Sequence, residues 1–293
     1  MKIAFAWTNG VRNKDRFNHW NDGLRAAMRL IEQEHTVTYH EPEEDIPEVD
    51  WILFWEAPCT FNSGADGWKY QKLLTRPSKK ALLFAGGPIK YEWVKEFDHV
   101  FVESKINEDE FNAIGVSNSR AFGVNTDVFK PESIQKEYDT VTHGTCASWK
   151  RQWLVCQAMK ERALVFGQKQ QHDTRPFDDC IACNSLVLDE VGYGTANLLL
   201  NKAYVGVNCA DYWGGGQRAT LEAMACDLPV VVMEDSPKNR EYVEESGYGA
   251  VVPPEPERIK EVVKLLKGTT GGRDYVMSKW TPRHYSNAIL NVL

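Results

Sequence analysis

A run of three glycines ahead of a helix is the part of this sequence best suited to binding chemistry. Residues 213–232 read W-G-G-G-Q-R-A-T-L-E-A-M-A-C-D-L-P-V-V-V, with a helix expected from Gln217 and a buried strand after it. Glycine lets a ligand approach the backbone, and a helix start offers unpaired N–H groups and a positive dipole end. Such a segment would seat a diphosphate, with Glu222 accepting hydrogen bonds from ribose hydroxyls. A tight packing turn followed by a solvated glutamate fits the spacing equally well.

Seven cysteines are spread along the chain without the spacing of a metal site. Cys180-Ile-Ala-Cys183 is the only C-x-x-C, and neither a second pair nor spaced histidines follow to complete four zinc ligands. Cys156, Cys209 and Cys226 stand in apolar runs, where buried reduced thiols are common. We therefore expect reduced thiols rather than a metal site or a redox pair, and a reducing, cytoplasmic location.

Short apolar runs alternate with amphipathic stretches along the chain. In the first part, strands are expected at 2–7, 36–40, 51–55, 80–85 and 99–103, and helices at 17–33, 91–97 and 107–114. After a break at 125–138, strands are expected at 139–143, 163–167, 185–189, 203–209, 228–233 and 249–252. Helices are expected there at 149–162, 192–201, 217–226, 238–246, 256–266 and 281–293, and a polar loop at 168–184. This repetition predicts two doubly wound α/β units with parallel sheets, which bind ligands at the carboxyl ends of their strands.

Four segments match one family in that family's own order. Residues 122–131 (F-G-V-N-T-D-V-F-K-P) resemble N-G-V-D-T-D-x-F-x-P, and residues 221–232 resemble L-E-A-M-A-C-G-L-P-V-V. Glu241 with residues 247–254 resembles E-x-x-x-x-G-x-x-G-x-L-V-P-P, and residues 278–280 with the last helix resemble a closing W…Y helix. The chain thus resembles glycosyltransferase family 4, well over residues 122–293 and only in outline over residues 1–102.

The resemblance implies a GT-B fold, in which two Rossmann-like domains face a cleft. Residues 1–130 would form the acceptor-side domain, residues 131–275 the nucleotide-sugar domain, and residues 276–293 a helix that packs back on the first domain. It also implies a retaining, hexosyltransferase-type reaction. A sugar would pass from a UDP- or GDP-linked donor to an acceptor hydroxyl, without a metal or a cofactor.

The resemblance also assigns donor-binding residues. The family's G-R-x-x-x-x-K segment falls on Gly144–Lys150, so that Lys150 would neutralise the donor diphosphate. Glu222 fits the second glutamate of the family's E-x7-E motif, which binds the donor ribose. The remaining donor-binding positions lie at the helix start: Gly214, Gly215, Gly216 and Gln217.

One departure from the family concerns the sugar contact. The first glutamate of E-x7-E falls on Gly214, so a nearby carboxylate, Asp211 or Glu234, would have to replace it. The expected catalytic positions are therefore Lys150, Gly214 and Asp211.

A second departure concerns the phosphate clamp, whose arginine falls on Thr145. Arg151 is the nearby replacement, although on a helix its side chain would point roughly 100° away from that of Lys150. The two departures favour an alternative, a catalytically impaired nucleotide-sugar or glycan-binding protein of the same fold. A dinucleotide-dependent oxidoreductase is disfavoured, because W-T-N-G-V-R after the first strand lacks G-x-G-x-x-G.

The acceptor side is less well marked. Asn9-Gly10 and Gly86-Gly87 follow the first and fourth expected strands, and they fit acceptor contacts and ordinary turns equally well. Four histidines near element ends are expected to be structural, and none is assigned as a base: His19, His40, His99 and His143.

Composition limits the choice of partners. Hydrophobic residues make up 43% and charged residues 26%, as in a globular protein, and no run approaches the roughly 20 apolar residues of a membrane span. The first residues resemble a strand rather than a signal peptide. A formal net charge of -7 disfavours a protein whose main task is gripping nucleic acid. A glycan, a lipid-linked glycan, a protein and modified DNA remain possible acceptors.

Overall fold

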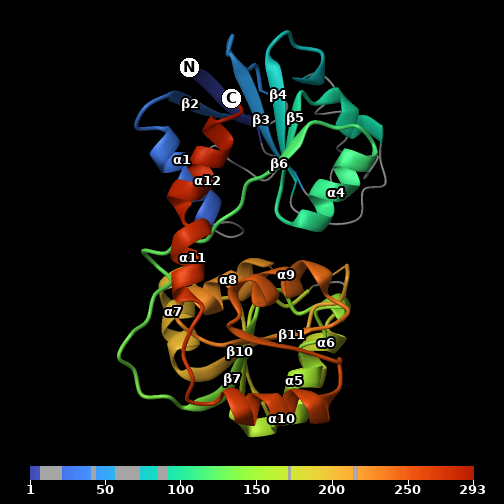
Figure 1. The fold of residues 1–293 in the computed structure, drawn as a ribbon, viewed down its shortest axis with the longest axis vertical. Coiled ribbons are helices and arrows are strands. Elements are labelled where there is room, and N and C mark those ends of the chain that lie inside the picture. Colours follow the sequence, from blue (N-terminus) through green and yellow to red (C-terminus); the bar gives the residue numbers. More distant parts are fainter. Residues whose placement is uncertain are drawn as a thin grey trace. The chain divides into compact units, whose positions relative to one another are not determined.

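The chain folds into two compact units, each with a six-stranded parallel sheet (Figure 1). The computed structural model describes residues 1–6, 22–40, 44–56, 73–84, 92–170, 173–213, 215 and 217–293. Unit 1 comprises Met1–Gly123 and Pro282–Leu293, and unit 2 comprises Val124–Thr281. The boundaries between the units therefore lie at 123/124 and 281/282, whereas the sequence predicts domain boundaries at 130/131 and 275/276. The chain thus passes between the two units twice. On the unit 2 side, the two connecting segments are bonded to each other, because the Val124 N–H donates to the Trp280 carbonyl over 2.9 Å.

Unit 1 contains six strands in the order β2-β1-β3-β4-β5-β6, all parallel. The strands are β1 (Lys2–Ala6), β2 (Thr36–His40), β3 (Trp51–Glu56), β4 (Lys79–Phe84), β5 (His99–Val102) and β6 (Asn118–Arg120). Among its described residues, the helices are α1 (Asp22–Ile31), a 3-10 helix (Glu92–Glu96), α4 (Lys105–Ala113) and α12 (Pro282–Leu290). The two sheet faces carry separate buried clusters, one under α1 and α12 and the other under the 3-10 helix and α4.

The C-terminal helix belongs to unit 1, as the GT-B resemblance implies. Helices α1 and α12 lie side by side (Figure 1), and Leu24, Met28, Tyr285 and Ile289 share one buried cluster with β1 and β3. The Trp51 indole N–H also donates to the carbonyl of the last residue over 2.8 Å. Of residues 276–293, those from Pro282 onward lie in this unit, whereas α11 (Arg273–Lys279) lies in unit 2.

Unit 2 has the strand order β12-β11-β10-β7-β8-β9, again all parallel. Its strands are β7 (Tyr138–His143), β8 (Ala163–Phe166), β9 (Leu186–Leu188), β10 (Ala203–Asn208), β11 (Val230–Met233) and β12 (Gly249–Val252). Its other helices are α5 (Trp153–Met159), α6 (Arg175–Ala182), α7 (Tyr193–Asn201), α8 (Gln217–Ala225), α9 (Pro237–Ser246) and α10 (Pro256–Leu266). The chain runs outward from β7 in one direction and from β10 in the other, so the topological switch point lies between these two strands.

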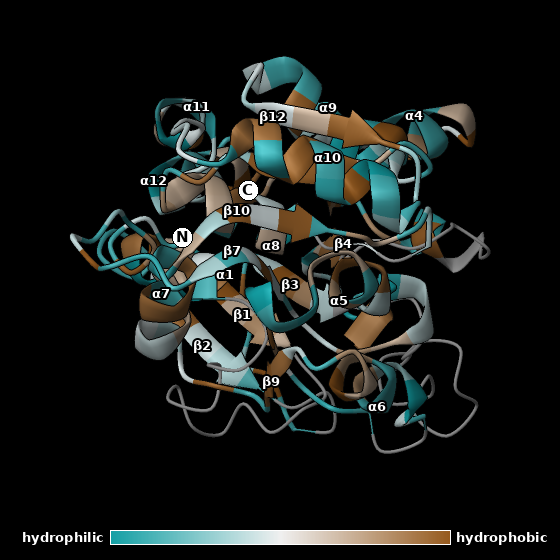
Figure 2. Cartoon of the chain, turned by 90° about the horizontal axis from the view of Figure 1, so that it is seen from below, coloured by the Kyte–Doolittle hydropathy of each residue, from teal (hydrophilic) through white to brown (hydrophobic). Residues whose placement is uncertain are grey.

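Helix amphipathicity places the helices on the sheets. In α10, Ile259 and Val263 are one turn apart and fully buried against the core of unit 2, while the charged positions around them are exposed. Brown and teal residues therefore occupy different faces of this helix (Figure 2). Burial of each such side chain contributes about 1.5–3 kcal/mol to stability.

Two local expectations in unit 2 are wrong. The helix expected at 149–162 is a 3-10 turn at Ser148–Lys150, then α5, then a second 3-10 turn at Lys160–Arg162. The regular helix cannot start at Trp149, because Arg151 has a left-handed backbone with φ 49°. The polar loop expected at 168–184 contains α6, which has a proline in its first turn and a buried Cys180.

No helix in the described ranges is long and apolar enough to cross a membrane.

Candidate functional site

The polar groups that bear on function gather at the carboxyl ends of the unit 2 strands. Strands β7 and β10 end at His143 and Asn208, on either side of the switch point. The chain then continues into loops at 144–152 and 209–213, and a third loop at 234–236 follows β11. Ligands of doubly wound sheets bind in this position, outside the carboxyl ends at the switch point.

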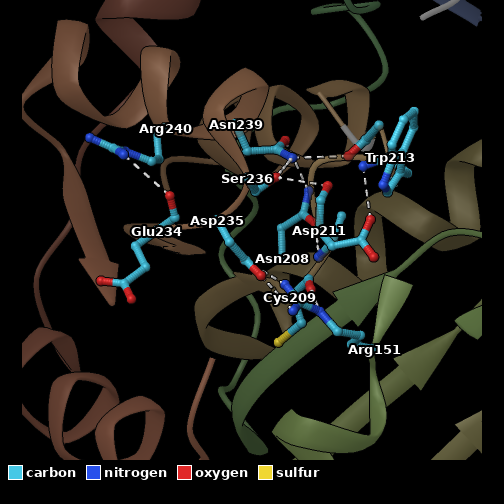
Figure 3. A network of polar contacts seen from close by, with 12 residues as sticks. Arg151, Asn208, Cys209, Asp211, Trp213, Glu234, Asp235, Ser236, Asn239 and Arg240 are labelled. Atoms are coloured by element: carbon cyan, nitrogen blue, oxygen red, sulfur yellow. Dashed lines mark hydrogen bonds and ion pairs between the residues drawn. The ribbon is translucent and has the colours of Figure 1, made fainter. Parts of the chain in front are cut away.

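A buried network of polar side chains holds Gly215 in place (Figure 3). The Asn239 amide donates to the Gly215 carbonyl over 2.9 Å and to Ser236 Oγ over 2.8 Å, and its Oδ1 accepts from Thr220 Oγ1 over 2.9 Å. Asn208 donates to the Thr220 hydroxyl over 2.9 Å. All four side chains are buried, and a satisfied network of this kind makes its surroundings rigid. The position of Gly215 is therefore set by residues from β10, α8 and α9.

Lys150 reaches the same glycine from the loop after β7. Its Nζ lies 3.9 Å from the point that a Cβ on Gly215 would occupy. Gly215 has φ +53°, a conformation that costs glycine little. The structure thus brings together Lys150 and Gly215, two of the predicted donor-binding residues. Gly214 and Gly216 lie outside the described residues.

Gln217 is the first residue of α8 and is 2% exposed. Its Oε1 lies 3.3 Å from the Cβ position of Gly215, which places the amide beside the glycine loop. Its Nε2 has no hydrogen-bond partner among the described residues. A buried donor without an acceptor lowers the stability of the protein by about 1–3 kcal/mol. An oxygen-rich ligand at this helix start would accept the hydrogen bond and restore that stability.

Glu222 lies deeper in α8 and faces the end of β7. Its Oε2 is 2.8 Å from Nε2 of His143, and both side chains are largely buried. The His143 ring is stacked on Phe166, with centroids 5.1 Å apart and an interplanar angle of 19°. Sequence reasoning treated His143 as structural. Its one available signal was its place, immediately before Gly144 at the end of a central strand.

The guanidinium of Arg151 is hydrogen-bonded to other residues of the protein (Figure 3). Its Nε donates to the Cys209 carbonyl over 2.8 Å, and its two terminal nitrogens bind the two oxygens of Asp235 at 2.7 Å each. Arg151 therefore ties together the loops that follow β7, β10 and β11. The backbone of Thr145, where the family has its arginine, is held by a bond from the Gln152 amide to its carbonyl.

The two carboxylates considered as sugar contacts lie in different places. The Asp211 N–H donates to the Trp149 carbonyl over 3.0 Å, and its Oδ1 accepts from the Trp213 N–H over 2.9 Å. Asp211 thus shapes the turn that leads into the glycine loop. Glu234 is exposed, and its side chain extends away from Asp211 (Figure 3).

Gly144 lies where strands β7 and β8 end. It has φ +111°, its N–H donates to the Phe166 carbonyl over 3.1 Å, and its carbonyl lies so close to Gly167 that a Cβ there would collide with it. The predicted acceptor-side positions Asn9, Gly10, Gly86 and Gly87 lie outside the described residues. Within the described ranges, no three His, Cys, Asp or Glu side chains form a potential metal site.

Comparisons with known proteins were made by sequence and by structure. No family model and no curated protein matches the sequence. Sucrose-phosphate synthase from Thermosynechococcus elongatus matches with a TM-score of 0.76 and 13% identity, over 100% of this chain and 98% of that one. Anabaena HepE in complex with UDP and glucose matches with a TM-score of 0.72 and 13% identity, over 100% and 99%.

The structural matches define the fold. The protein has the GT-B fold, as the sequence predicts, with two Rossmann-like units and a C-terminal helix that returns to the first. UDP-GlcNAc 2-epimerase from Methanocaldococcus jannaschii also matches, with a TM-score of 0.57 and 12% identity over 100% of this chain and 99% of that one. Since an epimerase and a synthase share the fold, the reaction has to be argued from the site.

Proposed function

We propose that this protein is a retaining glycosyltransferase, similar to family 4, that moves a sugar from a UDP- or GDP-linked donor to an acceptor hydroxyl. One observation carries the proposal: the Lys150 amino group, Gly215 and the Gln217 amide, whose Nε2 has no partner among the described residues, meet at the start of α8. A cation, a helix start and a buried donor without an acceptor all favour an anion rich in oxygen, and a diphosphate fits that description.

The proposed roles follow from the charge that develops during transfer. The bond between the anomeric carbon and the diphosphate oxygen breaks while the acceptor oxygen bonds to the same carbon from the same face. The departing phosphate takes the acceptor proton, so no side-chain base is required. Lys150 and the start of α8 neutralise the leaving group, and the fixed glycine loop positions it. No metal or cofactor takes part in this scheme.

The neighbouring residues complete the donor site. Glu222 binds the ribose, and Asp211, at the turn before Gly214, is the carboxylate nearest in the chain to the missing family glutamate. Arg151 acts as a positioning residue, because its guanidinium already binds Asp235 and the Cys209 carbonyl. A UDP-type donor is in keeping with HepE, whose structure holds UDP and glucose.

A second candidate is a nucleotide-sugar or glycan-binding protein that has lost transfer activity. It is favoured by Gly214 and Thr145, which stand where the family has a glutamate and an arginine. A nucleotide-sugar-binding protein would also bind the donor, so donor binding alone does not separate it from the transferase.

The test has two stages. In a thermal-shift screen, UDP or GDP should raise the melting temperature, because a ligand that binds only the folded state stabilises it. The stabilising nucleotide is then supplied as its sugar conjugates, with donor hydrolysis and transfer measured by release of the nucleoside diphosphate. Release supports the transferase, whereas binding without release supports the second candidate. Absence of any shift with UDP, GDP and their sugar conjugates would refute the transferase and a nucleotide-sugar-binding protein alike.

A further inference from the structure

A histidine that sequence reasoning left without a role holds the carboxylate of Glu222. His143 ends β7, and its Nε2 lies 2.8 Å from Oε2 of Glu222, which projects from α8. The two side chains are only 10% and 8% exposed. A carboxylate buried to this degree requires a donor, since an unpaired buried charge is strongly destabilising. His143 therefore determines which way this carboxylate points.

The imidazole is itself held by its neighbour on the next strand. Phe166 is the register partner of His143 on β8, and the two rings stack at a centroid distance of 5.1 Å. The stacking restricts the plane of the imidazole ring, and the contact with Oε2 of Glu222 keeps Nε2 directed at that carboxylate. Because an ionised carboxylate only accepts hydrogen bonds, Nε2 carries the proton, which fixes the tautomer of the ring.

This arrangement leaves one oxygen of Glu222 for a ligand. The bond to His143 is made by Oε2, so Oε1 can accept a hydrogen bond from a ligand. A freely rotating carboxylate would lose side-chain entropy on binding a hydroxyl. In this site the rotation is already restricted before a ligand arrives.

We propose that His143 is a positioning residue that orients Glu222 to select ribose over 2′-deoxyribose in the nucleoside diphosphate. The proposal rests on the proposed function, because it takes Glu222 as the ribose contact. If the pair served only to satisfy two buried groups, its removal would lower stability and leave the selection for ribose unchanged. Selection for ribose is therefore the property to measure.

The experiment is calorimetric titration of the full chain with UDP, GDP and their 2′-deoxy counterparts. The unaltered protein should bind the ribose form of the preferred nucleotide at least about tenfold more tightly, as expected for a hydrogen bond to a charged group. His143→Ala should reduce this ratio to within about threefold. His143→Gln should restore part of it, because the glutamine amide can still donate to Glu222.

His99→Gln is the matched control. His99 lies in unit 1 and has both ring nitrogens bonded to serine hydroxyls, at 3.0 Å and 2.8 Å, so its replacement should leave the ratio unchanged. Thermal melts establish that each variant is folded. Should His143→Ala fail to fold, Phe166→Leu takes its place, because it removes the stacking and keeps the imidazole. This variant should also bind the ribose and 2′-deoxyribose nucleotides with more similar affinities.

The outcomes separate this inference from the proposed function. If the folded His143→Ala protein prefers the ribose nucleotide as strongly as the unaltered protein does, the positioning role is overturned. Where Phe166→Leu is measured instead, an unchanged preference for ribose overturns it in the same way. If Glu222→Ala loses the ratio in the same experiment, the proposed function stands and only the role of His143 fails. If the unaltered protein binds neither UDP nor GDP, the proposed function fails and this inference fails with it.

Discussion

Replacing Lys150 by alanine should weaken binding of a nucleoside diphosphate far more than binding of the bare nucleoside. The Lys150 Nζ lies beside Gly215, in the loop that precedes α8. A diphosphate seated at that helix start would lie against the ammonium group, whereas the base and the ribose would not. Gly215 should keep its position in the variant, because its carbonyl accepts a hydrogen bond from the Asn239 amide.

The magnitude follows from the kind of bond that is lost. A hydrogen bond between an ammonium and a phosphate in a partly dry site contributes about 1.5–3 kcal/mol. Since about 1.4 kcal/mol corresponds to a factor of ten, the dissociation constant of UDP or GDP should rise about 10- to 150-fold. That of the nucleoside should change by less than about threefold.

Calorimetric titration with UDP and uridine, or with GDP and guanosine, measures both constants. Lys202→Ala is the control, because it removes the same charge from a surface ion pair with Glu137 of 3.0 Å, just ahead of β10 and β7. Such exposed pairs contribute about 0–1 kcal/mol to stability. Equal loss of diphosphate and nucleoside binding in Lys150→Ala would refute the phosphate role. A similar loss in Lys202→Ala would show that only the net charge matters.

Three further predictions concern the same site. Glu222→Ala should remove most of the thermal stabilisation by UDP or GDP, a loss of about 1.5–3 kcal/mol of binding energy; unchanged nucleotide affinity would exclude Glu222 from the site. Asn239→Ala should lower the free energy of unfolding by about 1–3 kcal/mol in urea titrations and weaken UDP or GDP binding, because it leaves the Gly215 carbonyl without its donor; unfolding without a loss of affinity would contradict the anchoring of the loop. Donor hydrolysis or transfer should survive EDTA, because Lys150 and the start of α8 meet the diphosphate charge; activity lost to EDTA and restored by magnesium or manganese would contradict the proposed mechanism.

The sequence predicted the sheets better than it predicted the turns between them. Buried strands such as β10 and β11 are marked by continuous apolar runs, and their alternation with amphipathic helices is sufficient to predict parallel sheets. A helix is expected to begin at Trp149, but the regular helix α5 begins only at Trp153. The left-handed backbone of Arg151 is fixed by bonds to Cys209 and Asp235, which lie 58 and 84 residues away. Contacts at such separations leave no trace in local periodicity.

Contacts between residues distant in the sequence also shape the candidate site. Motif matching therefore described only part of it. The glycines and Glu222 stand in one short segment, so their spacing was visible in the sequence. The groups that orient them were not: Asn239 lies 24 residues after Gly215, and His143 lies 79 residues before Glu222. A chain with the same glycines but without this amide would lose the bond that fixes the loop carbonyl. The proposed donor site is therefore a property of the folded unit, and residues outside the motif set its geometry as much as the motif does.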